Sequence, residues 1–171
     1  MSFEPKNLLF LCTGNSARSL VAEAVLNDHG AGRFRASSAG SQPRGEPHPV
    51  AIETLAEAGY ETQSLRSKSW DEFADDAAPA LDIVITLCDS AASEACPVWP
   101  GAPITVHWGL PDPATETEPQ ACRRAFAATL AAVEQAVTEL TDLPLEQMSA
   151  TGLKVCLDAI GQHISPPHPN E

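Results

Sequence analysis

Basic residues are scarce in this chain of 171 residues. It has 10 lysines and arginines against 23 aspartates and glutamates, which gives a formal net charge of −13 at pH 7. Nucleic acids and anionic membranes are bound by clustered positive charge, so this composition argues against both as partners. A bound anion must be captured by a local positive field, because the charge of the whole molecule offers no attraction.

Long apolar segments are also missing. No run approaches the roughly 20 residues that cross a bilayer, and the N-terminal residues lack the pattern of a signal peptide. We therefore expect a cytoplasmic protein with no membrane partner. Cysteine is limited to five residues. This odd number, without a compact secreted framework, favours reduced thiols with a chemical role over structural disulfides.

Apolar runs alternate with amphipathic helical patterns in the manner of an α/β domain. We expect strands at residues 7–12, 34–38, 81–87 and 104–107. We expect helices at residues 17–29, 49–59, 118–140 and 145–162. The predicted organisation is one domain over residues 1–142 and a C-terminal helical extension over residues 143–171, with a disordered end at 165–171.

The most informative stretch runs from Cys12 to Ser19 and directly follows the apolar run 8–11. A buried strand ending here delivers Cys12 to a tight turn. A helix beginning near Ala17 then aims its free N–H groups and positive dipole end at whatever lies over the sulfur, which favours the thiolate. Arg18 lies six residues after Cys12, so the loop can curl around a tetrahedral anion that the guanidinium grips by two oxygens. The stretch predicts an oxyanion site beside a nucleophile.

Other residues of this loop have predicted roles of their own. Gly14 has no Cβ where backbone must approach a ligand, Asn15 can hold an unusual loop conformation, and Ser19 can donate a hydrogen bond to the sulfur. The predicted oxyanion-binding residues are Thr13, Gly14, Asn15, Ser16, Ala17, Arg18 and Ser19. The alternative is that Cys12 is a small buried apolar residue at the end of a strand.

Two further segments with reactive side chains follow predicted strands. Cys88 comes directly after the third strand, and residues 108–113 come after the fourth. Because open α/β sheets bind ligands at the carboxyl ends of their strands, we expect both segments at the same edge as Cys12.

The motifs resemble the low-molecular-weight tyrosine phosphatase superfamily and, within it, the arsenate reductases that share its fold. The resemblance covers roughly residues 7–140 and rests on Cys12-Thr13-Gly14-Asn15-Ser16-Ala17-Arg18-Ser19, Ser38-Ala39-Gly40, Thr86-Leu87-Cys88-Asp89, Cys96-Pro97, His107-Trp108-Gly109 and Asp112-Pro113-Ala114. It implies a three-layer domain with a four-stranded parallel sheet flanked by helices. In the phosphatases an aromatic residue typically follows the Asp-Pro pair. Ala114 stands there instead, which favours the reductase branch.

The resemblance also places Asp112 over the nucleophile. A leaving oxygen must take a proton as its bond to arsenic or phosphorus breaks, and a carboxyl group on a loop over the nucleophile is the usual donor. We therefore expect Asp112 to be that acid. The alternative is a turn residue before proline.

Reduction of As(V) to As(III) needs two electrons, which a second thiol provides by attacking the adduct between Cys12 and arsenic. We expect Cys88 to attack, so that arsenite leaves as a Cys12–Cys88 disulfide forms, and Cys96 then to form Cys88–Cys96. If residues 88–96 start as a helix, the two Cα atoms lie about 12 Å apart, beyond the roughly 7 Å limit for a disulfide, so the helix must unwind. A buried thiol is the alternative for Cys96, and a zinc site lacks the usual ligand spacing.

The resemblance implies a thiol-dependent arsenate reductase that binds arsenate, with phosphate and sulfate competing, and that thioredoxin or glutaredoxin with glutathione regenerates. The alternatives are a phosphatase of the same fold and a non-catalytic oxyanion- or arsenite-sensing module, which would not need Asp112. We expect no cofactor and no bound metal. Asn15, Glu23 and Ser38 match positions that organise the loop with potassium in some such reductases, and the ammonium group of Lys68 can replace that cation.

Overall fold

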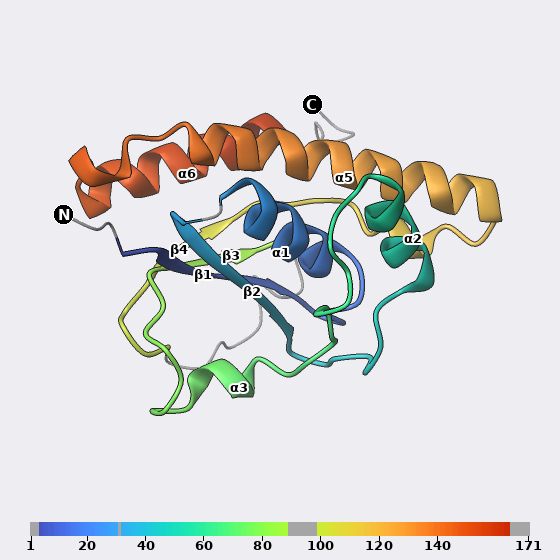
Figure 1. Ribbon diagram of the computed structural model, residues 1–171, viewed down its shortest axis with the longest axis horizontal. Coiled ribbons are helices and arrows are strands. Elements are labelled where there is room, and N and C mark those ends of the chain that lie inside the picture. Colours follow the sequence, from blue (N-terminus) through green and yellow to red (C-terminus); the bar gives the residue numbers. More distant parts are fainter. Residues whose placement is uncertain (1–3, 31, 89–98, 165–171) are drawn as a thin grey trace, which may run out of the picture.

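The sheet at the centre of the fold contains four parallel strands. The computed structural model describes residues 4–30, 32–88 and 99–164 (Figure 1). The strands are β1 (Lys6–Cys12), β2 (Phe34–Gly40), β3 (Ile83–Thr86) and β4 (Ile104–His107). Their order in space is β2-β1-β3-β4, and every neighbouring pair is parallel. The predicted α/β class and four-stranded parallel sheet are confirmed.

Helices cover both faces of this sheet, which makes three layers. They are α1 (Arg18–His29), α2 (Pro49–Glu57), α3 (Asp71–Ala74), α5 (Pro119–Thr141) and α6 (Ala150–Ile164), with short 3-10 turns η1 (Pro113–Thr115) and η2 (Leu145–Gln147). In Figure 1, α1, α5 and α6 lie above the sheet and α3 lies below it. The short α3 is absent from the sequence-based prediction.

Alternation along β1 divides the core between the two faces. Leu8 and Phe10 belong to the larger cluster, which includes buried residues of α1, α5 and α6. Leu9 and Leu11 belong to a smaller cluster on the other face, which packs against Phe73 and Ala74 of α3. Successive side chains of a strand point to opposite faces, so a strand that is covered on both sides is apolar throughout.

Most predicted elements differ from the structure by one or two residues at an end, and two differ by more. The predicted helix over 145–162 is instead a single turn at 145–147 followed by α6, because the hydroxyl of Ser149 accepts a hydrogen bond from the backbone N–H of Gly152 and begins a new helix there. The third strand is shorter than the predicted 81–87. The helix considered between Cys88 and Cys96 falls on residues 89–98, which lie outside the described residues, as does the predicted disorder at 165–171.

The C-terminal helix packs directly on the sheet. The indole N–H of Trp108 donates to the carbonyl of Leu157 at 2.9 Å, and both side chains are buried in the larger core. A Cβ at Gly161 would lie 2.7 Å from the carbonyl oxygen of His107, so glycine permits this close approach. The division at residue 142 stays a prediction. None of the helices in the described part of the chain is long and apolar enough to cross a bilayer.

Candidate active site

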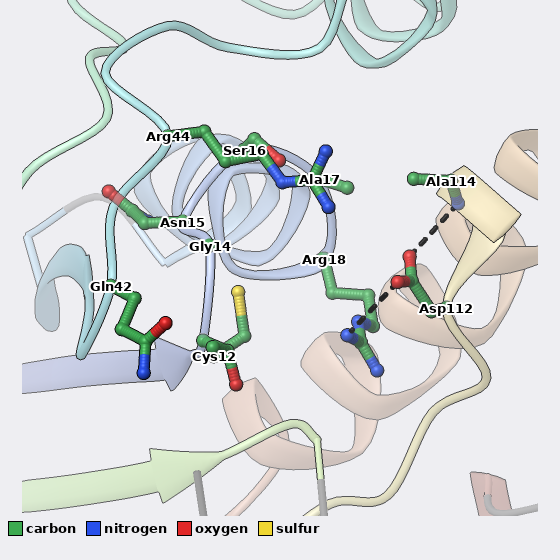
Figure 2. A pocket seen from close by; sticks show the side chains of 11 residues that line it. Cys12, Gly14, Asn15, Ser16, Ala17, Arg18, Gln42, Arg44, Asp112 and Ala114 are labelled. Carbon is green, nitrogen blue, oxygen red and sulfur yellow. Dashed lines mark hydrogen bonds and ion pairs between the residues drawn. The ribbon is translucent and has the colours of Figure 1, made fainter. Parts of the chain in front are cut away.

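The loop between β1 and α1 curls around a pocket of about 320 Å³. Figure 2 shows the sulfur of Cys12 pointing into the ring of side chains that surround this pocket. The described lining residues are Cys12, Thr13, Gly14, Asn15, Ser16, Ala17, Arg18, Gln42, Arg44, Asp112 and Ala114. The structure therefore brings together almost all of the predicted oxyanion-binding residues, together with Asp112. The exception is Ser19, which is fully buried and does not line the pocket.

Ser19 instead contacts the side chain of Cys12. Its hydroxyl lies 2.9 Å from the sulfur of Cys12, as the sequence analysis predicted. The side-chain amide of Asn15 donates to the same hydroxyl oxygen at 2.8 Å. Because the oxygen of Ser19 already accepts that bond, its hydrogen is available to a thiolate at Cys12.

Asn15 braces the loop from within. Its backbone has a φ of +44°, in the left-handed region that asparagine tolerates better than most residues. Its side-chain amide also donates to the hydroxyl of Ser38 at 3.0 Å, and its carbonyl accepts from the backbone N–H of Lys68 at 2.9 Å. These bonds fix a conformation that would otherwise be costly, so the predicted role of Asn15 in shaping the loop is confirmed.

Arg18 connects the start of α1 to the loop after β4. One terminal nitrogen donates to the carbonyl of Leu110 at 2.9 Å, and the other lies 3.8 Å from a carboxylate oxygen of Asp112 (Figure 2). Its Nε is buried and has no hydrogen-bond partner among the described residues. A buried donor without a partner at the wall of a pocket is a ready contact for an anion.

Asp112 lies beside the guanidinium of Arg18. One carboxylate oxygen accepts from the backbone N–H of Ala114 at 2.9 Å, which begins the turn η1 with Pro113 at its first position. The other oxygen faces Arg18. The two interpretations of Asp112 from sequence are therefore compatible, because the residue both caps a turn and lines the pocket.

Cys88 lies beside Cys12. The sulfurs of Cys12 and Cys88 belong to two buried side chains that pack together, 3% and 5% exposed. The hydroxyl of Thr13 lies 3.4 Å from the sulfur of Cys88. The two cysteines are neighbours because Cys12 ends β1, Cys88 follows β3, and these two strands end side by side. The backbone N–H of Leu87 donates to the carbonyl of Leu11 at 2.8 Å. Cys96 lies outside the described residues.

A buried ion pair lies beneath the loop. The carboxylate of Glu23 accepts from the hydroxyl of Ser38 at 2.9 Å, and the ammonium of Lys68 lies 3.6 Å from the same oxygen. Burial raises the pKa of Glu23, and the charge of Lys68 counteracts part of that rise. Burial lowers the pKa of Lys68, opposed by the charge of Glu23. Hydrogen bonds through Ser38, Asn15 and Ser19 link this pair to Cys12.

Replacing Lys68 by methionine is expected to lower the free energy of unfolding by about 3 kcal/mol, because Glu23 is then buried without its partner. Since the native state binds the Glu23 proton more tightly than the unfolded state does, stability falls as the pH rises from 4.5 through the raised pKa. Urea unfolding at about pH 5 and about pH 8 should show that Lys68→Met loses more stability at the higher pH. The double variant Glu23→Gln, Lys68→Met should recover most of the lost stability. Equal unfolding midpoints for Lys68→Met and the parent protein would contradict this account.

The segment after β2 contributes residues that the sequence analysis missed. The backbone N–H groups of Gln42 and Arg44 donate to the carbonyls of Thr13 and Gly14 at 2.9 and 3.0 Å. A Cβ at Gly40 would lie 2.4 Å from the carbonyl oxygen of Thr13. The only signal in the sequence was the Ser38-Ala39-Gly40 motif, which lies far from the loop along the chain.

We expect Gly40→Ala to distort the loop, because its new methyl group meets backbone atoms that have no freedom to move aside. The predicted results are a loss of about 1–3 kcal/mol in stability and weaker phosphate binding in calorimetry. Gly152→Ala is a matched control, since its Cβ meets only the side chain of Ser149, far from the pocket along α6. Phosphate affinity equal to that of the control would show that the close approach at Gly40 is unimportant.

Comparison with known proteins agrees with this geometry. The sequence profile of the family described as low molecular weight phosphotyrosine protein phosphatase matches residues 7–151. An arsenate reductase of Bacillus licheniformis is 38% identical over 109 residues, which are 64% of this chain and 75% of that protein. The chain therefore belongs to the low molecular weight phosphotyrosine protein phosphatase family, and the resemblance inferred from its motifs is confirmed.

Two solved structures are similar to this fold. One is an arsenate reductase in the phosphate-binding state, with a TM-score of 0.58 and 28% identity, covering 78% of this chain and 97% of that one. The other is a thioredoxin-dependent arsenate reductase of Corynebacterium glutamicum, with a TM-score of 0.55 and 25% identity, covering 81% of this chain and 64% of that one.

Proposed function

We propose that this protein reduces arsenate to arsenite, with Cys12 as the nucleophile and Cys88 as the second thiol. The observation that supports this most strongly is the contact between the buried side chains of Cys88 and Cys12, because Cys12 also lines the pocket. Hydrolysis of a phosphate ester needs one thiolate and water. Reduction needs an electron pair, and two adjacent thiols supply it as they form a disulfide.

The pocket wall favours a small oxyanion over an aryl phosphate. Its described lining residues include two arginines and several small polar residues, but no aromatic side chain. A phosphotyrosine ring is held by apolar and aromatic walls, and here Ala114 stands next to the Asp-Pro pair. Arsenate, phosphate and sulfate are tetrahedral oxyanions, so we expect phosphate and sulfate to compete with arsenate for the same donors.

The first step forms a bond between sulfur and arsenic. The thiolate of Cys12 attacks arsenate held by the loop amides and Arg18, and one arsenate oxygen leaves as water. Asp112 lies at the pocket wall beside Arg18, where it can donate the proton that this oxygen takes. The loop amides at the start of α1 and the guanidinium balance the negative charge throughout.

The second step transfers the electrons. Cys88 attacks the sulfur of Cys12, so a sulfur–sulfur bond forms as the sulfur–arsenic bond breaks, and its electron pair stays on arsenic. The sum is arsenic acid and two thiols giving arsenous acid, one disulfide and water. The hydroxyl of Thr13, 3.4 Å from the sulfur of Cys88, is placed to hydrogen-bond that sulfur before the attack.

Regeneration requires a further thiol. In our proposal Cys96 attacks Cys88, forms Cys88–Cys96 and releases the thiolate of Cys12. A dithiol protein, thioredoxin or glutaredoxin with glutathione, then reduces that disulfide, and the thioredoxin-dependent relative from C. glutamicum supports the first of these. Such donors work where thiols are kept reduced, so we place the protein in the cytoplasm.

The direct test is arsenate-dependent NADPH oxidation with a complete thioredoxin system and, separately, a complete glutaredoxin system. Hydrolysis of an aryl phosphate is measured beside it. We expect arsenate turnover with at least one donor system and only weak hydrolysis. Efficient hydrolysis without arsenate turnover would instead make the protein a phosphatase, which needs Cys12, Arg18 and Asp112 but no second thiol.

A further inference from the structure

Arg44 is held against the catalytic loop although it comes from a separate segment of the chain. Its backbone N–H donates to the carbonyl of Gly14 at 3.0 Å, and its side chain lies over the same residue. A Cβ at Gly14 would be 3.1 Å from Nε of Arg44 and 3.3 Å from its Cγ. The missing Cβ of Gly14 therefore makes room for this arginine.

The guanidinium of Arg44 has no protein partner in the described part of the chain. No carboxylate or hydrogen-bond acceptor there engages its side chain, whereas Arg18, Arg33, Arg66 and Arg123 each form an ion pair. The side chain is exposed and lines the pocket as its second guanidinium (Figure 2). Its charge and its hydrogen-bond donors are available to a ligand.

The charge of the whole chain makes such a group useful. A net charge of −13 repels an incoming dianion, and Arg18 is mostly buried, with its side chain 13% exposed and engaged by Leu110 and Asp112. A cation at the mouth of a pocket raises the local concentration of anions despite an unfavourable total charge. Among the described lining residues, Arg44 is the cation that solvent reaches first.

We propose that Arg44 is a second anion-binding side chain, which captures arsenate at the pocket mouth and contacts it while Arg18 holds it deeper inside. This rests on the proposed function, since it assumes that the pocket binds an oxyanion. Arg44 lies on the rim over Gly14, and the buried contact with Cys12 is made by Cys88. Its contribution therefore falls on substrate affinity, with little effect on the chemical steps.

The experiment compares Arg44→Gln with Arg35→Gln by calorimetric titration of the reduced protein with inorganic phosphate. Both variants have the same net charge, and Arg35 is an exposed residue near the start of β2, whereas the pocket lies beyond the strand's other end. Any difference in phosphate affinity between the two variants therefore reflects where the arginine lies in the structure. We expect Arg44→Gln to weaken phosphate binding about tenfold and Arg35→Gln to change it less than about twofold. Arg44→Lys should recover part of the loss, because it keeps the charge without the planar fork.

Steady-state kinetics provides the second measurement. For Arg44→Gln we expect a rise in KM for arsenate that matches the loss of phosphate affinity, with kcat within about twofold of the parent enzyme. Phosphate affinity equal to that of Arg35→Gln would overturn the proposal, as would a fall in kcat at unchanged affinity. Either of these two outcomes overturns the role of Arg44 but leaves the proposed function of the protein unchanged. Failure of the parent protein itself to bind phosphate would overturn both.

Discussion

Replacing Cys12 with serine is expected to abolish arsenate reduction and any aryl phosphate hydrolysis, by at least about a thousandfold, while the fold survives. The hydroxyl of serine is a far weaker nucleophile than a thiolate. The change removes little volume at a site where Cys12 is only 3% exposed. The variant should still bind phosphate in calorimetry, since the loop amides and Arg18 are unchanged.

Coupled NADPH oxidation and aryl phosphate hydrolysis measure the two activities of this variant. Cys156→Ser is the matched control, because Cys156 lies on α6 and is not among the described lining residues. We expect the control to keep nearly full activity. Activity above a few per cent in Cys12→Ser would place the nucleophile elsewhere.

Replacing Cys88 with serine is expected to separate the two activities. The first step uses Cys12, Arg18 and Asp112, all of which remain, so weak aryl phosphate hydrolysis should persist at the parent rate. Arsenate turnover should fall at least about a hundredfold, because the substitution removes the sulfur that packs against Cys12 among the described residues. Both rates are measured on the same preparation, so the retained hydrolysis serves as the control for folding.

A different result would change the mechanism. If Cys88→Ser reduces arsenate at the parent rate, an external thiol attacks the arsenic adduct directly, and the packing of Cys88 against Cys12 is incidental. If the Cys88→Ser variant loses aryl phosphate hydrolysis as well, Cys88 maintains the shape of the pocket. The loss of arsenate turnover would then reflect a damaged pocket and not a missing attacking thiol.

The sequence was sufficient to predict the parts of the fold that depend on local patterns. The apolar run before Cys12 gave β1, and its register placed the cysteine at the carboxyl edge of the sheet. The conformation of Asn15 and the contact of Ser19 with the sulfur followed from the chemistry of those side chains within one loop. The break before Ala150 was missed because the hydrophobic pattern continues through it, whereas the Ser149 cap depends on a single hydroxyl.

Contacts between distant segments were harder to predict. Arg44 comes from the loop after β2 and reaches Gly14 only because the two segments pair through backbone hydrogen bonds. Nothing in the composition around Arg44 distinguishes it from a solvated surface residue. The sequence indicates Lys68 as a cation near the loop, but it does not predict the ion pair with Glu23. That contact depends on how α1 packs against β2 and against the segment before α3.

In the proposed reaction, the thiols of this chain supply both electrons. The most direct measurement adds one equivalent of arsenate to the fully reduced protein without any external reductant, then quantifies arsenite and maps alkylated cysteine peptides by mass spectrometry. We predict about one equivalent of arsenite and the loss of two free thiols, with Cys88 in a disulfide to Cys12 or Cys96. Unchanged arsenate with all thiols still free for alkylation would contradict the account.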